Sequence, residues 1–473
     1  MDFTPIAFTD CLHGFAFAGL IFAGRDFQGE YISRVSTESP LKQNRSAAAA
    51  LKRAESVFAN ETGPVDDRFL ASLARLLHEA GTPSHRIESI VSGCADRLGI
   101  KASIFSLPTW ISISVEDGDR QRTSNFRVDP GSPKMALLEE TYRVADRVAA
   151  GELDASRGLA ALRTGYERLW RPPSIAMTVG YALFSAAAAR LLGGTVDDMI
   201  VALPVGFCVG LSLRLSAGRR ERELLSEFGG AFFATLFAAL GVLIAAKASI
   251  EANIAVVALA GIVTLLPGLA LTTAMSELSA RNLASGSARL MGAVTSLVVI
   301  AMGVAVGEAT VQYLGLGALS EQQMPVAGAL SFDIATAVAL VLGALGIAIA
   351  FHARPARFWL VLSSCVLGYV AARVARTTFD GALAPVAAAA FIGIAGNVYS
   401  WLRRRPTGTV VLPAIALLLP GSIGFRGMRN LISRDTSDTL AGLDTFTHAL
   451  VIAASIAAGL LIANALVPRR IHA

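Results

Sequence analysis

The chain has 473 residues, of which 53% are hydrophobic and 16% are charged, and its formal net charge is +5 at pH 7. Soluble domains carry about 25% charged residues, so a wholly soluble globular protein is excluded. The positive charge lies mostly in arginines at the ends of apolar segments rather than on one basic face with stacking aromatics, so a nucleic-acid partner is not expected. The four cysteines show no CxxC spacing, which predicts neither a disulfide framework nor a zinc site.

Residues 1–65 are expected to form a mobile tail. The apolar patch at residues 15–23 has no basic segment before it, so it does not fit a signal peptide. Residues 66–172 then have the ordinary charge of a soluble domain, whereas the remainder is almost uncharged outside short clusters. We therefore predict a soluble domain followed by a membrane domain.

Residues 66–172 predict a small α+β domain. Apolar residues at helical spacing indicate a helix that Gly81 ends, and Thr82-Pro83 supplies a cap and a first residue for the next helix. Alternation of apolar and polar residues then predicts strands, with Asp117-Gly118 as a hairpin turn. The predicted helices are 66–80, 83–97, 134–150 and 154–169, and the predicted strands lie near 102–107, 110–115 and 123–128.

The soluble segment shows no motif for catalysis. It contains no phosphate loop, no GxSxG sequence and no cluster of metal-ligand residues. His78 and His85 lie beside Glu79 and Glu88, but single residues of these types at helix ends are commonly solvated, and we favour that interpretation. No catalytic residue, metal or cofactor is therefore expected, and an enzyme is disfavoured.

The rest of the chain predicts an all-α polytopic membrane protein. A transmembrane helix needs about 20 apolar residues, and ten such segments occur after residue 173. They lie near 174–192, 199–215, 228–246, 252–273, 288–307, 334–351, 358–375, 381–401, 410–424 and 446–467.

These segments form an internal repeat. The tetrapeptide Leu-Leu-Pro-Gly occurs at 265–268 and again at 418–421, which is 153 residues later, and the flanking apolar segments recur at nearly the same offset. The predicted unit is five helices used twice, over residues 173–325 and 326–473. Because five is odd, the second copy must enter the membrane from the opposite side, so the repeats are predicted to be inverted.

Charge at the helix ends supports this topology. With the soluble domain in the cytoplasm, the arginine clusters at 219–222, 354–357 and 403–405 all face the cytoplasm, as the positive-inside rule requires. The exceptions, which the topology places at or near the outside, are Lys247, the pair Arg373 and Arg376, and the group Arg426, Arg429 and Arg434. That last group either has a function or argues against the predicted connection between the ninth and tenth transmembrane helices.

The repeated Pro-Gly is the strongest candidate for a substrate site. Proline inside a helix removes an amide donor and frees the carbonyl four residues earlier, and lipid cannot satisfy that carbonyl. The amides after the break attract anions, so a zwitterionic amino acid suits such a site. A helix kink without function is the alternative for either copy alone. The predicted substrate path consists of Thr264, Pro267, Gly268, Thr272, Thr273, Pro420, Gly421, Ser422 and Asn397, of which Asn397 could equally bond a neighbouring helix.

Carboxylates within the membrane are costly and mark ion or proton routes. Glu227 and Asp380 coincide under the repeat offset, and Glu277 follows the first break. These three residues are the candidates for proton coupling. Glu308 is more consistent with a position at the membrane interface.

Three stretches of the sequence resemble a known family. LLHEAGTPSHRIE, SLPTWISISV and TLLPGLALTTAMSELSARNLASGSARL resemble the amino-terminal module of the threonine/serine exporter family, and NVYSWLRRRPTGTVVLPAIALLLPGSIGFRGMRNLI resembles its carboxy-terminal module. The likeness spans about residues 66–465. It implies a ten-span exporter of the bacterial inner membrane that removes threonine, serine and small peptides from the cytoplasm, driven by the proton motive force.

Two other functions stay open. The chain could export another small solute, a dicarboxylate or a peptide, although a dianion would normally require a buried cation. It could also be a membrane-anchored enzyme or sensor acting through residues 66–172. The expected partners are a small-molecule substrate, protons and membrane lipid, and the sequence leaves a homo-oligomer open.

Overall fold

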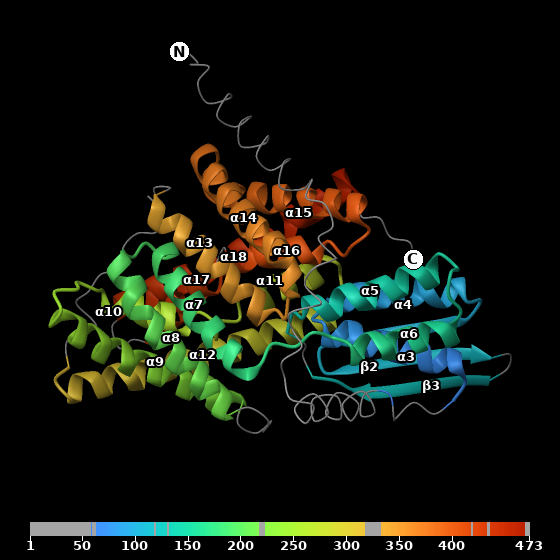
Figure 1. Ribbon diagram of the computed structural model, residues 1–473, viewed down its shortest axis with the longest axis horizontal. Coiled ribbons are helices and arrows are strands. Elements are labelled where there is room, and N and C mark those ends of the chain that lie inside the picture. Colours follow the sequence, from blue (N-terminus) through green and yellow to red (C-terminus); the bar gives the residue numbers. More distant parts are fainter. Residues whose placement is uncertain are drawn as a thin grey trace, which may run out of the picture. The chain divides into compact units, whose positions relative to one another are not determined.

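The computed structural model describes residues 58, 63–117, 120–129, 132–216, 223–316, 333–417, 420–432 and 436–468 (Figure 1). The chain divides into two units, Met1–Asn60 and Glu61–Ala473. The predicted tail at residues 1–65 lies outside the described residues except for residue 58 and residues 63–65. All elements discussed below belong to the second unit.

The segment predicted to be soluble folds into the helices and strands that its sequence pattern predicts, and we keep the name soluble domain for these residues. Its elements are α3 (Val65–Glu79), α4 (Ser84–Arg97), β1 (Lys101–Leu107), β2 (Trp110–Asp117), β3 (Arg120–Arg127), α5 (Met135–Ala149) and α6 (Ala155–Glu167). The strands form an antiparallel sheet in the order β1-β2-β3, and Asp117 pairs with Arg120 across the predicted hairpin. Gly81 lies just after the end of α3 and turns the chain away from the helix by adopting a φ of +78°. The carboxylate of Asp154 caps the start of α6 by accepting a hydrogen bond from the amide of Arg157.

One face of this sheet is covered by helices. Ile111, Ile113 and Val115 alternate along β2 and are at most 5% exposed, while α3 packs against β2 and α4 packs against β1. No residue of β3 is buried. The sheet is therefore half-solvated, as the period-two alternation of its strands predicts.

The remaining described residues form apolar helices. They are α7 (Ser174–Leu191), α8 (Val196–Ser216), α9 (Glu223–Ala246), α10 (Ile254–Ile262), α11 (Gly268–Ser279), α12 (Leu283–Tyr313), α13 (Ile334–Ala350), α14 (Phe358–Thr378), α15 (Leu383–Arg403), α16 (Gly408–Leu417), α17 (Pro420–Ile432) and α18 (Thr436–Leu466), with a 3-10 turn at Pro355–Arg357. Each of the ten predicted apolar segments coincides with one of these helices or with the pair α10–α11 or α16–α17.

Length and composition identify fewer complete spans than the ten predicted. Within the described part of the chain, seven helices are long and apolar enough to cross a membrane, and the bent pair α16–α17 makes an eighth if it is one span. Helix α13, with 17 residues, is a shorter apolar helix. Helices α10 and α11 have 9 and 12 residues, so at 1.5 Å per residue neither can cross about 30 Å of hydrocarbon alone.

Small residues let the membrane helices approach closely. A Cβ at Gly346 of α13 would lie 2.7 Å from the carbonyl oxygen of Gly180 in α7, so the two backbones are in direct contact. At the other end of this pair, Arg190 of α7 forms a 2.8 Å ion pair with Asp333, the N-cap of α13. An early residue of each helix thus meets a late residue of the other, so α7 and α13 run antiparallel.

The soluble domain docks on three connections between membrane helices. The amide of Ser84 donates to Glu277 near the end of α11, at 2.9 Å. The amide of Met135 donates to the carbonyl of Phe351 after α13, at 2.7 Å. Glu139 forms an ion pair with Arg405, in the connection between α15 and α16, at 3.1 Å. These contacts hold the domain and the membrane helices together.

Candidate functional site

The first Leu-Leu-Pro-Gly motif breaks a helix, as predicted. Helix α10 ends at Ile262 and α11 begins at Gly268, with Pro267 as its N-cap residue at φ −80° and ψ 43°. Across the break only short-range bonds remain, such as the Leu265 amide to the Ile262 carbonyl at 2.8 Å. The first amides of α11 have no acceptor within their own helix, because a helix start always leaves such donors.

The second motif also lies at a helix junction. Helix α16 ends at Leu417 and α17 begins at Pro420, and the two are bent by 40°. The two leucines of this motif, at 418 and 419, lie outside the described residues. Pro420 and Gly421 therefore open α17 as Gly268 opens α11.

The two breaks meet in space. A Cβ at Gly421 would lie 3.0 Å from the amide nitrogen of Gly268 and 3.0 Å from the Cβ of Leu266. A side chain at Gly421 would therefore require its neighbours to shift by a few tenths of an ångström. Two motifs at the repeat offset are thus in direct backbone contact, which neither motif alone predicts.

From this contact the two half-helices lead to opposite ends of α12. Helix α11 ends beside the start of α12, where Glu277 pairs with Arg289. Helix α17 runs toward the other end, where Arg429 pairs with Glu308. Glu308 lies about 37 Å along α12 from Leu283 at 1.5 Å per residue. The breaks therefore lie between the two ends of the helix bundle.

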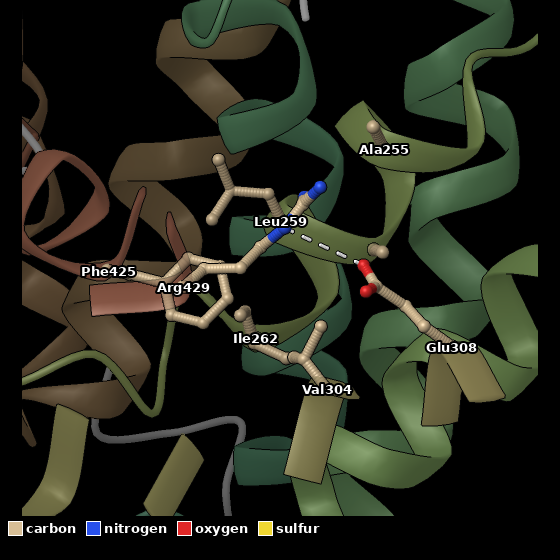
Figure 2. Close-up of a pocket in the computed structure, with 8 residues that line it drawn as sticks. Ala255, Leu259, Ile262, Val304, Glu308, Phe425 and Arg429 are labelled. Carbon is tan, nitrogen blue, oxygen red and sulfur yellow. Dashed lines mark ion pairs between the residues drawn. The ribbon is translucent and has the colours of Figure 1, made fainter. Parts of the chain in front are cut away.

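A pocket adjoins the breaks (Figure 2). It encloses about 290 Å³ of non-atom space, part of it open to solvent. The enclosed part that a water-sized molecule can occupy is only about 10 Å³, which is room for about one water and far below the volume of a pre-formed ligand pocket. Three helices supply the lining, which consists of Ala255, Ala258, Leu259 and Ile262 from α10, Val304 and Glu308 from α12, and Phe425 and Arg429 from α17.

Two opposite charges face one another in this apolar pocket. The Nε of Arg429 lies 3.7 Å from the Oε1 of Glu308, and the side chains are 34% and 26% exposed. Figure 2 shows both side chains reaching toward each other past Leu259 and Val304. One turn earlier on α17, the Nε of Arg426 is buried and has no hydrogen-bond partner among the described residues. Charged side chains are rare on apolar helices of this kind because they are costly inside a bilayer.

The predicted path residues surround the breaks but do not line this pocket. The Oγ1 of Thr264 is buried and has no hydrogen-bond partner in the described part of the chain. Thr272 donates to the Leu269 carbonyl at 2.9 Å within its own helix, whereas Thr273 is half-buried. Ser422 is 4% exposed. The pocket is lined instead by residues near these positions, Ile262 and Phe425.

Asn397 is placed away from the breaks, in a helix-packing role. It is fully buried, and its Nδ2 donates to the carbonyl of Val467 at 2.9 Å and to the Oδ1 of Asn464 at 3.1 Å. Its Oδ1 accepts from Thr407 at 3.3 Å. The side chain thus joins α15 to the end of α18, which is the interhelical alternative that the sequence left open.

The three predicted proton-coupling carboxylates lie in three different environments. Glu227 lies in α9, where it accepts from the hydroxyl of Ser296 in α12 at 3.1 Å. Asp380 is exposed in the connection between α14 and α15 rather than inside a helix. Glu277 is fully buried at the junction with the soluble domain.

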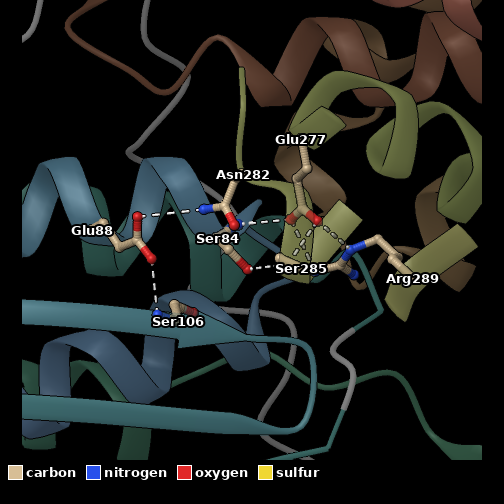
Figure 3. A network of polar contacts seen from close by, with 7 residues as sticks. All are labelled: Ser84, Glu88, Ser106, Glu277, Asn282, Ser285 and Arg289. Carbon is tan, nitrogen blue, oxygen red and sulfur yellow. Dashed lines mark hydrogen bonds and ion pairs between the residues drawn. The ribbon is translucent and has the colours of Figure 1, made fainter. Parts of the chain in front are cut away.

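Glu277 is the centre of a polar network (Figure 3). Its carboxylate accepts from the Ser285 hydroxyl at 2.7 Å and from the Arg289 guanidinium at 3.3 Å, in addition to the Ser84 amide. Beside it, Glu88 accepts from the Ser106 amide at 2.9 Å and from Asn282 at 3.4 Å. Burial raises the pKa of Glu88, and these two hydrogen bonds oppose that effect.

Two histidines at the same junction are held neutral. Burial lowers the pKa of His78, and the nearby Arg289 lowers it further. Burial also lowers the pKa of His352, which lies in the connection after α13, and Lys134 adds to the effect. The Nε2 of His78 and the Nδ1 of His352 are buried without a hydrogen-bond partner among the described residues. Within those residues, no group of three or more His, Cys, Asp or Glu side chains could hold a metal ion.

The pair Arg429–Glu308 was not among the predicted site residues. One signal in the sequence pointed to it, because Arg429 belongs to the group that violates the positive-inside rule. Glu308 was assigned to the membrane interface, and sequence spacing gives no reason to pair it with a residue more than a hundred positions away. Only the packing of α17 against α12 brings the two together.

Comparison with known proteins places most of the chain in one family. Residues 68–311 match a family model described as a threonine/serine exporter, and residues 335–466 match a second, described as Threonine/Serine exporter, ThrE. No solved structure matches the chain.

Several curated relatives are fungal proteins. An uncharacterized protein of Schizosaccharomyces pombe is 24% identical over 370 residues, covering 76% of this chain and 48% of that protein. Pheromone-regulated membrane protein 10 of Zygosaccharomyces rouxii is 23% identical over 366 residues, covering 75% of this chain and 36% of that protein. Its counterpart in Saccharomyces cerevisiae is 25% identical over 369 residues, covering 75% and 46%. The chain thus spans half or less of the length of these relatives.

Proposed function

Because the chain belongs to the threonine/serine exporter family, we propose that it exports threonine and serine from the cytoplasm across the bacterial inner membrane, driven by the proton motive force. The observation that carries this proposal is the contact between the two Pro-Gly breaks beside a small charged pocket. In secondary transporters, broken helices at matched positions of two repeats form the substrate site.

Ten crossings are part of this proposal, and the docking of the soluble domain supports them. The domain lies on one side of the membrane, so every connection it contacts must lie on that side. Helices α7, α8 and α9 make three crossings before the contact at Glu277, so the pair α10–α11 must make a fourth. Helices α12 and α13 lie between the contact at Glu277 and the contact at Phe351, and α14 and α15 lie between Phe351 and the contact at Arg405. An even number of crossings therefore separates each pair of contacts, as the ten-crossing topology requires.

The packing of equivalent helices supports inverted repeats. Helices α7 and α13 are the first helices of the two proposed halves, and they run antiparallel. Helices α11 and α17 follow the two breaks and lead to opposite ends of α12. Both relations are expected of halves that enter the membrane from opposite sides.

Proton coupling is proposed for a carboxylate within the bundle. Glu227 suits this role because it lies in a long apolar helix and contacts Ser296 of α12. Glu277 is already engaged at the junction, by the guanidinium of Arg289 and by the amide of Ser84. Asp380 is exposed in a connection. We therefore assign the coupling to Glu227 ahead of the other two.

Efflux from reconstituted vesicles tests the proposed function. Vesicles are loaded with labelled threonine, serine or succinate, and efflux is followed with and without a pH gradient that is acidic outside. We expect threonine and serine to leave faster than succinate, and the gradient to accelerate them. Efflux that ignores the gradient would contradict the proton coupling, and preferential efflux of succinate would indicate a dicarboxylate exporter instead.

A further inference from the structure

Arginines gather where α14 begins and α15 ends. Some lie in the connection before α14 and the others at the end of α15 and just after it, and together they are Arg354, Arg357, Arg403, Arg404 and Arg405. The two groups meet at Glu139, whose Oε2 lies 3.6 Å from the Nε of Arg357 and 3.1 Å from the Nη1 of Arg405. Because one carboxylate oxygen reaches both, the start of α14 and the end of α15 lie side by side.

The carboxylates that pair with this arginine cluster do not balance its charge. Glu139 is shared by Arg357 and Arg405, and Glu140 is shared by Arg354 and by Arg143 of its own helix. The side chains of the remaining two cluster members, at 403 and 404, are exposed. The arginines thus outnumber the glutamates that pair with them, and since like charges repel, the cluster favours a further anion.

The paired arginines retain room for such an anion. The side chains of Arg354, Arg357 and Arg405 are 40%, 31% and 32% exposed although each lies beside a glutamate. A guanidinium carries five N–H donors, more than one carboxylate oxygen can accept. The same planar fork matches the geometry of a phosphate group, which arginine binds better than lysine does. The chemistry of the cluster therefore suits a phosphate.

Two exposed tryptophans place the cluster at the level of lipid headgroups. Trp359, two residues after Arg357, is 70% exposed, and Trp401, two residues before Arg403, is 52% exposed. The indole N–H of Trp401 donates to the carbonyl of Pro468 at 2.9 Å. Both α14 and α15 are long and apolar enough to cross a membrane, and tryptophans at the ends of such helices lie among the headgroups.

We propose that the arginine cluster binds the headgroup of an anionic phospholipid, with the guanidiniums on its phosphate and the two tryptophans beside its glycerol. Basic sites between transmembrane helices bind anionic headgroups in this way. Leu402, within the cluster, is 74% exposed and offers an apolar surface to an acyl chain. A zwitterionic phospholipid brings a positive charge of its own, which the arginines repel. The inference goes beyond the proposed function and holds for any transported solute.

Hydrogen exchange locates the site on the unmodified full chain. The protein is compared in nanodiscs of phosphatidylcholine alone and in nanodiscs of phosphatidylcholine mixed with phosphatidylglycerol. We expect phosphatidylglycerol to slow amide exchange at least about threefold at residues 403–408 and to leave residues 378–383, at the other ends of α14 and α15, unchanged. Equal slowing at both ends, or none at residues 403–408, overturns the proposal.

Two matched double variants test the arginines. Arg403→Gln with Arg404→Gln removes two exposed arginines of the cluster, whereas Arg373→Gln with Arg376→Gln removes two exposed arginines toward the opposite end of α14. Native mass spectrometry of the detergent-solubilised chain measures the dissociation constant for phosphatidylglycerol. An arginine beside an anionic headgroup contributes about fivefold in affinity, so the cluster variant should bind about 10- to 30-fold more weakly and the control within about threefold of wild type.

The other outcomes contradict the site. Equal losses in the two double variants would mean that the lipid responds to net charge alone. Phosphatidylcholine that binds as tightly as phosphatidylglycerol would remove the selectivity. Glycerol 1-phosphate carries the phosphate without acyl chains, and if it displaces the lipid at equal concentration, the arginines bind a soluble phosphate instead. Size-exclusion profiles identify a variant that does not fold, and the exchange experiment on the unmodified chain then decides the matter.

Discussion

Gly421 is the residue at which the two Pro-Gly breaks approach each other most closely. A Cβ there would lie 3.0 Å from the backbone of Gly268. The same helix contains Gly424, one turn later, where a Cβ would have its nearest neighbour, the side chain of Leu297, at 3.4 Å, an ordinary contact. The two glycines thus separate the effect of the contact between breaks from the effect of adding a methyl group to α17.

We expect Gly421→Ala to reduce threonine efflux at least tenfold while Gly424→Ala retains efflux near the wild-type rate. The added methyl group would lie 3.0 Å from the backbone of Gly268, so the contact between α17 and α11 must shift by a few tenths of an ångström, and overpacking of this kind costs about 1–3 kcal/mol. Initial efflux rates, normalised to the amount of protein in the vesicles, measure the difference. Equal rates in the two variants would show that the contact does not matter for transport.

The division of this segment into two short helices, α10 and α11, depends on the break at Pro267-Gly268. Without Pro267 and Gly268, the apolar sequence from Ile254 to Ser279 could continue as one helix. A continuous helix would remove the separate helix start at Gly268 and would change the wall of the pocket at Ile262.

Replacing Pro267-Gly268 with Ala-Leu should therefore abolish transport while leaving membrane insertion intact. Pro204→Ala is the control, because Pro204 lies inside helix α8, which is continuous despite the proline, so its loss should not change the course of that helix. Insertion is measured by protease protection and transport by threonine efflux. Full activity in the Ala-Leu variant would refute the role of the break.

Helix α11 is also the element through which the soluble domain reaches the break. Glu277, near its end, is held by Ser84 of α4 and by Arg289 of α12. Glu277→Gln would leave the guanidinium of Arg289 without its countercharge, and breaking a buried pair in this way costs about 3–5 kcal/mol. We expect faster amide hydrogen exchange at the start of α4 and along α11. Asp67→Asn, which removes the pair with Arg122 inside the soluble domain, should leave exchange in α11 unchanged.

At the scale of the whole molecule, the junction between the soluble domain and the membrane helices should weaken in acid. The pKa values of His78 and His352 are lowered in the folded protein, so the unfolded chain binds more protons as the pH falls below about 6.5. Each histidine then removes up to about 1.4 kcal/mol of stability per pH unit. Glu88 acts in the opposite sense, because its raised pKa favours the folded state once the pH falls below that value.

The melting temperature of the full chain should therefore decrease between pH 7 and pH 5.5. The double variant His78→Gln, His352→Gln should show a smaller decrease, since glutamine does not titrate. Differential scanning fluorimetry in detergent measures both. An equal decrease in the two proteins would mean that the histidines do not control the acid sensitivity of this junction.

Local features of the fold could be predicted from the sequence, whereas contacts between distant segments could not. Gly81, Asp154 and Pro267 set helix ends by backbone geometry and capping, so α3, α6 and α11 begin or end close to the predicted positions. The pairing of Glu308 with Arg429 and the docking of Glu277 on Ser84 depend on tertiary packing. Periodicity carries no information about such contacts.

Passage of the substrate through the point where the two breaks meet is the step on which the proposed function depends most. It is tested by cysteines at the pocket positions Ile262 and Phe425, placed in turn in a chain without its native cysteines. Threonine should slow alkylation of both by a thiol reagent, and it should leave the rate unchanged at a control cysteine replacing Ile200, which is 52% exposed on α8. Alkylation at positions 262 and 425 that is indifferent to saturating threonine would contradict the claim.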